Sequence, residues 1–349
     1  MKTAAAKYQF CIRFNSVDVN SAASKAVLDC NAIFLQQGYK DFTFTVSDNS
    51  NRIKYYALLL KNMLTFFFSI KPGAVVGVQY PLLSINNVFR YFIKLARFKK
   101  VFFFCIVHDL HSLRTGGNNQ ALIDDDITNL NQFDCIIVHN KQMLAWLNQN
   151  GLQQEAVILE VFDYLSDNFN ISKTDTSGEK RIVYAGNLIK SKFIYNLHKL
   201  KNWSFNLYGP GYDPLLQTKS ETVVWKGQFS PEQIAKELQG NYGLIWDGEN
   251  CNACDEILGN YLKYNAPHKF SLYIAAGLPV IAPAGSAIGD FIKANNIGFL
   301  IDSVYDLDKI NISPVDYSMM KSNVMVLREK ITNGYFFTEA LLKTEGAIF

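Results

Sequence analysis

The chain contains 349 residues, of which 49% are hydrophobic and 19% charged, the proportions of a folded globular protein. This length is too great for one ordinary core and predicts two domains. The formal net charge of +3 is too small to indicate a nucleic-acid-binding protein, so an anionic ligand must be met by local clusters of charge.

The N-terminal stretch MKTAAAKYQFCIRF contains Lys7 and Arg13 and lacks the continuous apolar segment of a signal peptide. The longest apolar run, residues 55–70, is interrupted by Lys61 and Asn62 and is not expected to span a membrane. The six cysteines are scattered, and several lie in apolar strand-like runs, as reduced and buried thiols do. We therefore expect a soluble cytoplasmic protein.

The first half of the chain alternates short apolar runs with helical patterns. Strands are predicted at 8–14, 41–46, 74–79, 101–107 and 134–139, and helices at 21–37, 52–69, 87–98 and 141–150. Continuous apolar strands separated by helices predict a parallel sheet covered on both faces.

A polar stretch at 163–180 is interpreted as a linker, after which the alternation resumes. Strands are predicted at 181–185, 204–208, 222–226, 242–246, 279–282 and 298–301, and helices at 230–239, 268–276 and 287–295. The predicted fold is α/β, with two Rossmann-like domains facing a cleft. Ligands of such sheets bind beyond the carboxyl ends of the strands.

The stretch KYNAPHKFSLYIAAGLPVIAP, residues 263–283, predicts an anion site. Pro267 suits the first turn of a helix, whose unpaired amide groups and dipole attract anions. His268 adds a donor and Lys269 a full charge, which together suit a diphosphate. The alternative is an ordinary helix start with a solvent-facing lysine.

Two glycine-containing loops follow predicted strands and converge on the same cleft. GNLIKSKF offers Gly186 for close approach and Lys190 and Lys192 for charge, and GPGYD at 209–213 is a tight turn. On the next loop, Phe229 stands before a helix with Ser230 as its N-cap. Phe229 is interpreted either as a stacking surface for a nucleobase or as a hydrophobic staple of that helix.

The motif VHDLHSLR follows the strand at 101–107 and is the candidate for chemistry. His108 or Asp109 could act as a general base at this strand end, with His111 and Arg114 beside them. A metal site here lacks a clear third ligand, and Cys251 and Cys254 form a single CxxC without a second pair, so no metal is predicted. The alternative is an aspartate cap with surface histidines.

Residues 87–100 form an amphipathic pattern with Arg90, Lys94 and Arg97 on the polar face. This pattern fits either a core helix with a solvated face or a helix that docks on an anionic membrane. Residues 20–30 begin a helix with Asn20 or Ser21 as the cap. No GxGxxG motif is present there, which disfavours dinucleotide binding of the dehydrogenase type.

The ordered motifs NSAASKAVLD, VHDLHSLR, VYAGNLIKSKF, LYGPG, GLIWDG and NYLKYNAPHKFSLYIAAGLPVI resemble one family. It is the family of bacterial GT-B glycosyltransferases that contains adhesin-modifying glucosyltransferases and galactofuranosyltransferases. The resemblance covers residues 8–310, and its most specific part is the block from PHK to GLPVI.

The resemblance implies a hexosyltransferase that takes a sugar from a UDP-sugar held mainly by the C-terminal domain. The donor-binding residues it implies are Ser21, Gly186, Asn187, Lys190, Tyr208, Phe229, Asn260, Tyr261, Ala266, Pro267, His268, Lys269, Phe270 and Ser271. The acceptor-binding residues are Lys25, His111 and Arg114, and the catalytic residues are Asp109 and His108. The implied domains are 1–165, 166–317 and a C-terminal helix, 318–349, that crosses back to the first domain.

Many retaining GT-B enzymes carry two glutamates eight positions apart, and the matching positions here are Tyr264 and Leu272. This departure favours inversion with Asp109 as the base, without a metal or other cofactor. The expected acceptor is a glycan, a glycopeptide or a lipid-linked oligosaccharide; contact with the inner face of the membrane and self-association stay open. The alternative functions are a non-catalytic partner or chaperone of another transferase, and a sugar-nucleotide epimerase.

Overall fold

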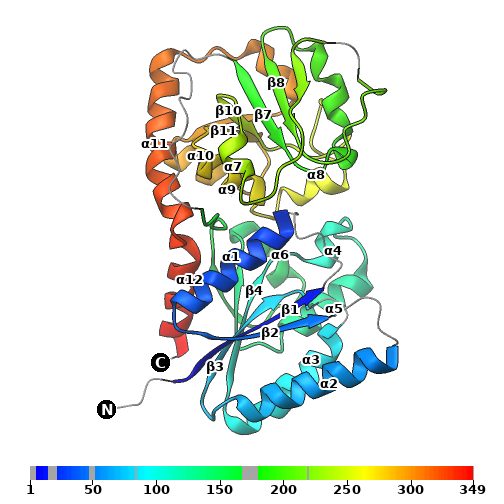
Figure 1. Cartoon of the computed structure of the whole chain (residues 1–349), viewed down its shortest axis with the longest axis vertical. Coiled ribbons are helices and arrows are strands. Elements are labelled where there is room, and N and C mark those ends of the chain that lie inside the picture. Colours follow the sequence, from blue (N-terminus) through cyan, green and yellow to red (C-terminus); the bar gives the residue numbers. More distant parts are fainter. Residues whose placement is uncertain are drawn as a thin grey trace.

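The computed structural model describes residues 5–14, 22–46, 52–82, 85–166, 180–217 and 220–348. These residues form two α/β units stacked along the long axis of the molecule, and the C-terminal helices run down one side of both (Figure 1). Each unit is built on a six-stranded sheet in which all paired strands are parallel.

The first sheet has the order β2-β1-β3-β4-β5-β6. Its strands are β1 (Lys7–Phe14), β2 (Lys40–Val46), β3 (Val75–Tyr80), β4 (Phe102–Val107), β5 (Cys135–Val138) and β6 (Glu155–Ile158). The helices of this unit are α1 (Ala22–Gln36), α2 (Arg52–Ser69), α3 (Asn86–Ala96) continued by the 3-10 turn η2 (Arg97–Lys99), α4 (His111–Arg114), α5 (Gln120–Leu130) and α6 (Lys141–Gln149).

The second sheet has the order β12-β11-β10-β7-β8-β9. Its strands are β7 (Arg181–Ala185), β8 (Ser204–Tyr208), β9 (Val223–Trp225), β10 (Tyr242–Leu244), β11 (Val280–Pro283) and β12 (Gly298–Ile301). The helices are η3 (Leu188–Lys190), η4 (Lys192–Lys199), α7 (Ile234–Glu237), α8 (Ile257–Tyr261), α9 (His268–Ala275), α10 (Gly289–Asn295), η5 (Val304–Lys309), α11 (Pro314–Thr332) and α12 (Tyr335–Ile348).

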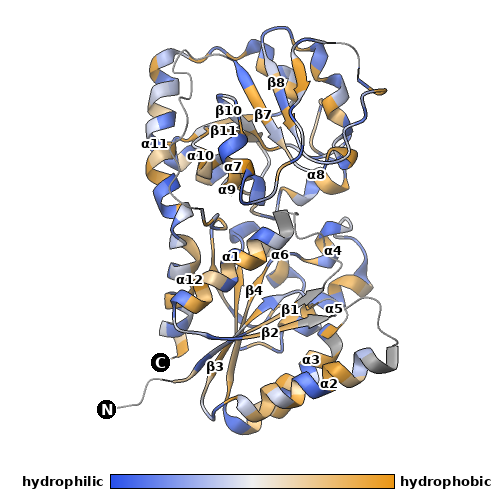
Figure 2. Ribbon diagram, in the orientation of Figure 1, coloured by the Kyte–Doolittle hydropathy of each residue, from blue (hydrophilic) through white to orange (hydrophobic). Residues whose placement is uncertain are grey.

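The sheets are apolar because helices cover both faces, and the ribbon of the strands in Figure 2 is accordingly mostly hydrophobic. All of β3 and nearly all of β4 are buried. The predicted fold class, two Rossmann-like α/β domains, is therefore confirmed. Sequence patterns missed β6 and α5. The strand β6 is only half-buried with an exposed first residue, which leaves no continuous apolar run to detect.

The single helix expected at 318–349 is two helices broken at Gly334, whose φ of +77° favours glycine. A side chain at this position would also lie 2.9 Å from Ile33 on α1. The break directs α12 onto the first unit, where Phe337 packs edge-on against Phe34 with ring centroids 4.9 Å apart. Tyr39 reinforces this contact by donating a hydrogen bond to Glu345 (2.8 Å).

The start of the predicted linker at 163–180 is buried, which the sequence did not predict. Residues 167–179 lie outside the described residues, but Asp163 and Tyr164 are buried within the core rather than exposed. The carboxylate of Asp163 accepts hydrogen bonds from the backbone N–H groups of Phe336 (3.1 Å) and Phe337 (2.8 Å). It thereby satisfies two amides in the first turn of α12 that have no partner within the helix. A polar residue at this position is thus part of the core.

None of the helices within the described ranges combines the length and the apolar character that crossing a bilayer requires.

We expect Asp163→Ala to lower the free energy of unfolding by about 1–3 kcal/mol, because it leaves two buried N–H donors without acceptors. Urea unfolding of the full chain measures this change. Asp290→Ala is the matched control, since Asp290 is an exposed first-turn residue of α10 and its loss is expected to cost about 0.5 kcal/mol or less. Equal effects of the two substitutions would contradict the assigned role of Asp163.

Candidate functional site

The strand order of the second sheet reverses direction at β7 and β10, where α/β sheets bind their ligands, so a ligand crevice is expected at the carboxyl ends of these two strands. These two strands are neighbours, but the chain proceeds from β7 toward one edge and from β10 toward the other. Such a reversal opens a ligand crevice at the strand ends. Gly186 follows β7, Asp247 follows β10, and the side chain of Lys269 from the first turn of α9 lies between them.

The ammonium group of Lys269 is held by three oxygens. It donates to Asp247 (2.6 Å), to the hydroxyl of Tyr184 (2.8 Å) and to the carbonyl of Trp246 (3.3 Å). Burial opposes the charge of Lys269, but Asp247 and the neighbouring tyrosines outweigh it and raise the pKa of Lys269 above its ordinary value. Lys269 is therefore charged, and Asp247 balances part of that charge.

Glycines let the loops of the crevice approach one another. A Cβ atom on Gly186 would lie 2.9 Å from Cε of Lys269, and one on Gly209 would lie 1.9 Å from the carbonyl oxygen of Gly186. Gly209 also has a φ of +128°. Asn187 accepts a hydrogen bond from the N–H of Ile189 and so begins η3, at whose end Lys190 is exposed. The crevice thus has one partly balanced cation and one exposed cation.

Phe229 and Tyr208 lie together at one end of this crevice, with ring centroids 6.2 Å apart. Tyr208 is buried, and its hydroxyl accepts from the N–H of Gln239 (2.9 Å) and donates to the carbonyl of Glu237 (3.2 Å). Phe229 is half-buried. Of the two rings, Phe229 is the one with a face available to a ligand, and Tyr208 packs beside it.

Much of the predicted donor segment faces the first unit instead of the crevice. The N–H of Ala266 donates to Nδ1 of His139 (3.0 Å), and the hydroxyl of Ser271 donates to the carbonyl of Phe162 (2.6 Å). Phe270 is buried and packs edge-on against Phe291. Ala266 and Ser271 therefore lie in a seam between the two units, whereas Phe270 packs within the second unit.

The remaining members of the segment cap or support it. Pro267 is the N-cap of α9, and Asn260 donates to the carbonyl of Asp255. The ring of His268 lies beside Tyr164, with centroids 5.2 Å apart, and burial lowers the pKa of His268 to about 3. His268 is therefore neutral and adds no charge to the helix start.

Asp109 stands at the carboxyl end of β4, opposite the second unit. One carboxylate oxygen accepts from the hydroxyl of Tyr261 on α8 (2.8 Å), and the other accepts from Arg114 (2.9 Å). The carboxylate is one-third exposed. The sequence placed Asp109 and Tyr261 in separate sites, for the base and the donor, and the structure brings them into contact.

His108 turns away from this pair. Its Nε2 atom lies 2.8 Å from Oε1 of Gln79, and its ring stacks on Phe162 with an interplanar angle of 13°. Burial, aided by His139 and His268, lowers the pKa of His108 to about 3. A histidine with so low a pKa is a weak base at neutral pH.

The three residues predicted to bind the acceptor lie in different environments. His111 and Arg114 are exposed on α4. Lys25 is buried, forms an ion pair with Asp29, donates to the carbonyl of Leu165 (2.8 Å) and lies over the ring of Tyr164. Lys25 thus secures the chain between the two units. Ser21 lies outside the described residues.

Sequence reasoning missed several residues around these groups. Asp247 immediately follows the predicted strand at 242–246, so the strand-end rule that selected Asp109 could also have selected it. His139 likewise ends the strand predicted at 134–139. Its Nδ1 accepts from Ala266, so its Nε2 carries the proton and donates to the carbonyl of Val107 (2.9 Å). No local signal marks Gln79 or Tyr184 as partners of His108 and Lys269.

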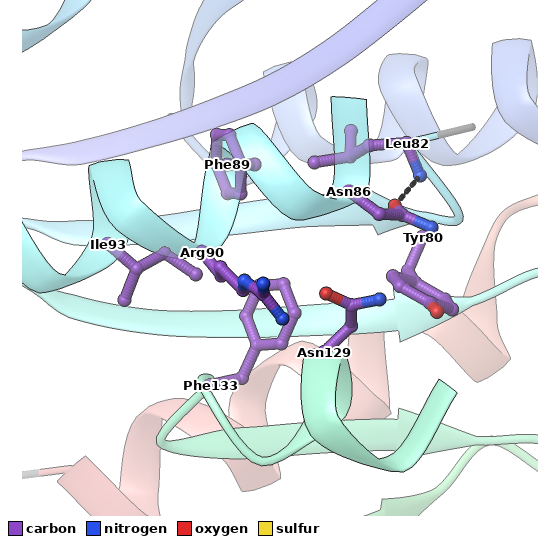
Figure 3. Close-up of a pocket in the computed structure, with 8 residues that line it drawn as sticks. All are labelled: Tyr80, Leu82, Asn86, Phe89, Arg90, Ile93, Asn129 and Phe133. Atoms are coloured by element: carbon purple, nitrogen blue, oxygen red, sulfur yellow. Dashed lines mark hydrogen bonds between the residues drawn. The ribbon is translucent and has the colours of Figure 1, made fainter. Parts of the chain in front are cut away.

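Two cavities lie near these strand ends. One, between α3 and α5, has a volume of about 10 Å³, at the lower limit for holding one water molecule, and is lined by Arg90 and Asn129 among others (Figure 3). The other has a volume of about 140 Å³ beyond the carboxyl ends of β11 and β12, beside Lys263 and Asp302. Neither could hold a whole sugar nucleotide.

Over the described ranges, no three His, Cys, Asp or Glu side chains gather in a way that could hold a metal ion. Cys251 and Cys254 are free thiols that donate to the carbonyls of Phe193 (3.4 Å) and Asp247 (3.0 Å).

Models of the glucosyltransferase 3-like family match the chain twice, with the N-terminal domain at residues 9–161 and the C-terminal domain at 182–344. The β-1,6-galactofuranosyltransferase WbbI of Escherichia coli (strain K12) is 30% identical over 286 residues, covering 79% of this chain and 81% of WbbI. Glucosyltransferase 3 of Streptococcus gordonii is 25% identical over 327 residues, covering 92% and 93%. The lipopolysaccharide outer core galactosyltransferase WaaB, solved in its apo form, shares the fold with a TM-score of 0.57 at 11% identity, covering 96% and 99%.

We predict that burial of the neutral His139 makes the free energy of unfolding depend on pH. Burial lowers the pKa of His139 from 6.5 to about 4, so between these values only the unfolded chain binds the proton. Stability must fall as the pH falls through this window, by about 1.4 kcal/mol per pH unit. Urea unfolding of His139→Gln at several pH values should show a slope shallower by about this amount. Gln149→Asn, at an exposed position without a titratable side chain, is the control, and its slope should equal that of the unsubstituted chain.

Proposed function

This chain belongs to the glucosyltransferase 3-like family of glycosyltransferases, and we propose that it transfers a hexose from a UDP-sugar to a glycan or glycoconjugate acceptor without a metal ion. The two relatives named above are a galactofuranosyltransferase and a glucosyltransferase, which supports a hexose of glucose or galactose type.

The observation that carries the proposal is the position of Lys269. This side chain enters the crevice from the first turn of α9, beside Gly186 and Asp247. Unpaired amide groups at a helix N-terminus and an adjacent ammonium group suit a diphosphate. Lys190, exposed on the neighbouring loop, supplies a second cation. The half-buried face of Phe229 at the end of the same crevice suits a nucleobase, which we take to be uracil from the family resemblance.

Asp109 is the proposed general base. It lies across from the α8–α9 segment, and its partner Tyr261 belongs to that segment. In the proposed step, an acceptor hydroxyl oxygen bonds to the anomeric carbon while Asp109 takes the hydroxyl proton. The bond from the anomeric carbon to the diphosphate breaks, and UDP leaves with the electron pair. Lys269, Lys190 and the amides of α9 stabilise the negative charge of the leaving group. His111 and Arg114 are the proposed acceptor contacts, because both are exposed on α4 and Arg114 donates to Asp109.

We also propose that the reaction takes place in the cytoplasm, where UDP-sugars are synthesised. The acceptor is a glycan, a glycopeptide or a lipid-linked oligosaccharide, and no cofactor takes part.

Lys190→Ala is expected to weaken UDP binding about 10- to 100-fold, because a charge-assisted hydrogen bond contributes about 1.5–3 kcal/mol. Calorimetric titration with UDP measures the change, with GDP and ADP as controls for the base. Lys201→Ala is the matched variant: Lys201 is also exposed but precedes β8, at the other end of the sheet. Undetectable binding of all three nucleotides by the unsubstituted chain would refute the donor class and favour a non-catalytic partner.

Asp109→Asn should lower the rate of UDP release from UDP-glucose or UDP-galactofuranose about 100- to 10,000-fold, the usual contribution of a general base. UDP affinity should stay within about twofold, because Asp109 lies across from the diphosphate site. The control is Asp124→Asn, an exposed carboxylate on α5. Rates are measured with a panel of saccharide acceptors. An unchanged rate would exclude Asp109 as the base, and conversion of the donor into another UDP-sugar without acceptor would identify an epimerase.

A further inference from the structure

The helices α2 and α3 lie side by side on the first unit, at the end of the molecule farthest from the second (Figure 1). Phe66 and Phe67 of α2 pack against Phe92 of α3, with ring centroids 5.5 and 6.3 Å from it. The inner sides of both helices are thereby buried in the core of the first unit. Their outer sides form one continuous surface, which we call the α2–α3 face.

The α2–α3 face is unusually apolar for an exposed surface. The helices α2 and α3, with the turn η2 that follows α3, carry nine large exposed hydrophobic side chains: Tyr56, Leu58, Leu60, Leu64, Phe68, Val88, Tyr91, Leu95 and Phe98. Phe68 is 74% exposed and Phe98 is 87% exposed. Leu60, Leu64 and Phe68 follow one another at intervals of four residues and so lie along one stripe of α2. Exposed apolar surface of this extent marks a site that binds a membrane or another molecule.

The charges of the same region have one sign. Residues 52–100 contain nine lysines and arginines and no aspartate or glutamate, so the rest of the chain has a net charge of −6 (+3 minus +9). Lys61 and Lys94 are exposed among the apolar side chains, and Lys71, Arg97 and Lys100 are exposed around them. Arg97 is partly balanced by Asp134, at 3.0 Å. The partner must therefore be both apolar and negatively charged.

We propose that the α2–α3 face docks on an anionic lipid bilayer. Aromatic and aliphatic side chains would enter the boundary between headgroups and acyl chains, while the lysines remain among the anionic headgroups. A second copy of the chain fits poorly, because two faces of the same positive charge would be brought together. Two lysines alone would hold the protein weakly, so the aromatic side chains are essential to the docking.

Docking of the α2–α3 face on a bilayer would also restrict the class of acceptor. If the proposed function holds, a transferase fixed to a bilayer by its acceptor-side unit meets lipid-linked acceptors in preference to free glycans. That consequence rests on the proposed function, whereas the docking itself does not.

The test is co-sedimentation of the full chain with phosphatidylcholine vesicles, with and without phosphatidylglycerol. We expect binding at least about tenfold tighter to the anionic vesicles, weakened by high salt. Replacing Phe68 and Phe98 with serine, or Lys61 and Lys94 with glutamine, should each reduce binding about tenfold or more. These four side chains are exposed, so the fold is expected to be unaffected, and thermal unfolding checks this.

The matched controls are Leu215→Ser, 92% exposed on the second unit, and Lys201→Gln; both should bind as the unsubstituted chain does. Equal binding to neutral and anionic vesicles, or full binding by the serine variant, would overturn the proposal. So would concentration-dependent dimerisation that the serine variant abolishes, since it would identify a second copy as the occupant. UDP titration of the same variants separates the two proposals: vesicle binding without UDP binding would leave the docking intact and refute the donor class.

Discussion

The packing of Phe162 between the two units is the contact on which the site depends. Its ring lies among His108 from the end of β4, His139 from the end of β5 and His268 from the start of α9. Its carbonyl oxygen accepts from Ser271, on the same helix as His268. The strand end that carries the candidate base and the helix start that carries Lys269 are therefore fixed to one residue. A change in this packing would alter the separation between the acceptor side and the donor side.

Around the seam and the neighbouring crevice, the buried histidines are neutral and the buried lysines are paired with carboxylates. Burial holds His108, His139 and His268 neutral, with pKa values lowered to about 3 or 4. Lys25 is paired with Asp29 and Lys269 with Asp247. A diphosphate at the start of α9 would consequently meet a helix terminus and a partly balanced lysine. Lys190, exposed on a loop of the same crevice, then has a larger share in the proposed binding than its place in the sequence suggests.

Strand and helix patterns predicted most of this architecture, because a buried parallel sheet leaves continuous apolar runs that are easy to detect. The rule that ligands bind at strand ends also selected Asp109 and Gly186. It could not separate residues that face the crevice from residues that face the other domain. Ala266 and Ser271 lie in the same motif as Lys269, and only the three-dimensional path of the chain around the start of α9 assigns them to the seam.

Polar residues in the core were the least predictable. Lys25 and Asp163 are residue types usually found on the surface, yet both are buried. Each has hydrogen-bond partners more than a hundred residues away: the carbonyl of Leu165 for Lys25, and the first turn of α12 for Asp163. Pairings over such distances leave no periodic signal in the sequence. The same limit hid the contact between Asp109 and Tyr261, which are separated by 152 positions.

The positions that differ from retaining GT-B enzymes have a structural use in this chain. Tyr264 packs near Trp146 of the first unit, with ring centroids 6.4 Å apart, and its carbonyl accepts from Asn140 (2.8 Å). Leu272 is buried in the core that both units share. A glutamate at 272 would place an unpaired charge in that core, which is strongly unfavourable. Tyr264 and Leu272 of the α8–α9 segment thus take part in packing between the two units. Tyr261 of the same segment donates to Asp109 of the first unit. Under the proposed function, a base that approaches from the unit opposite the donor favours attack on the face away from the diphosphate, and hence inversion.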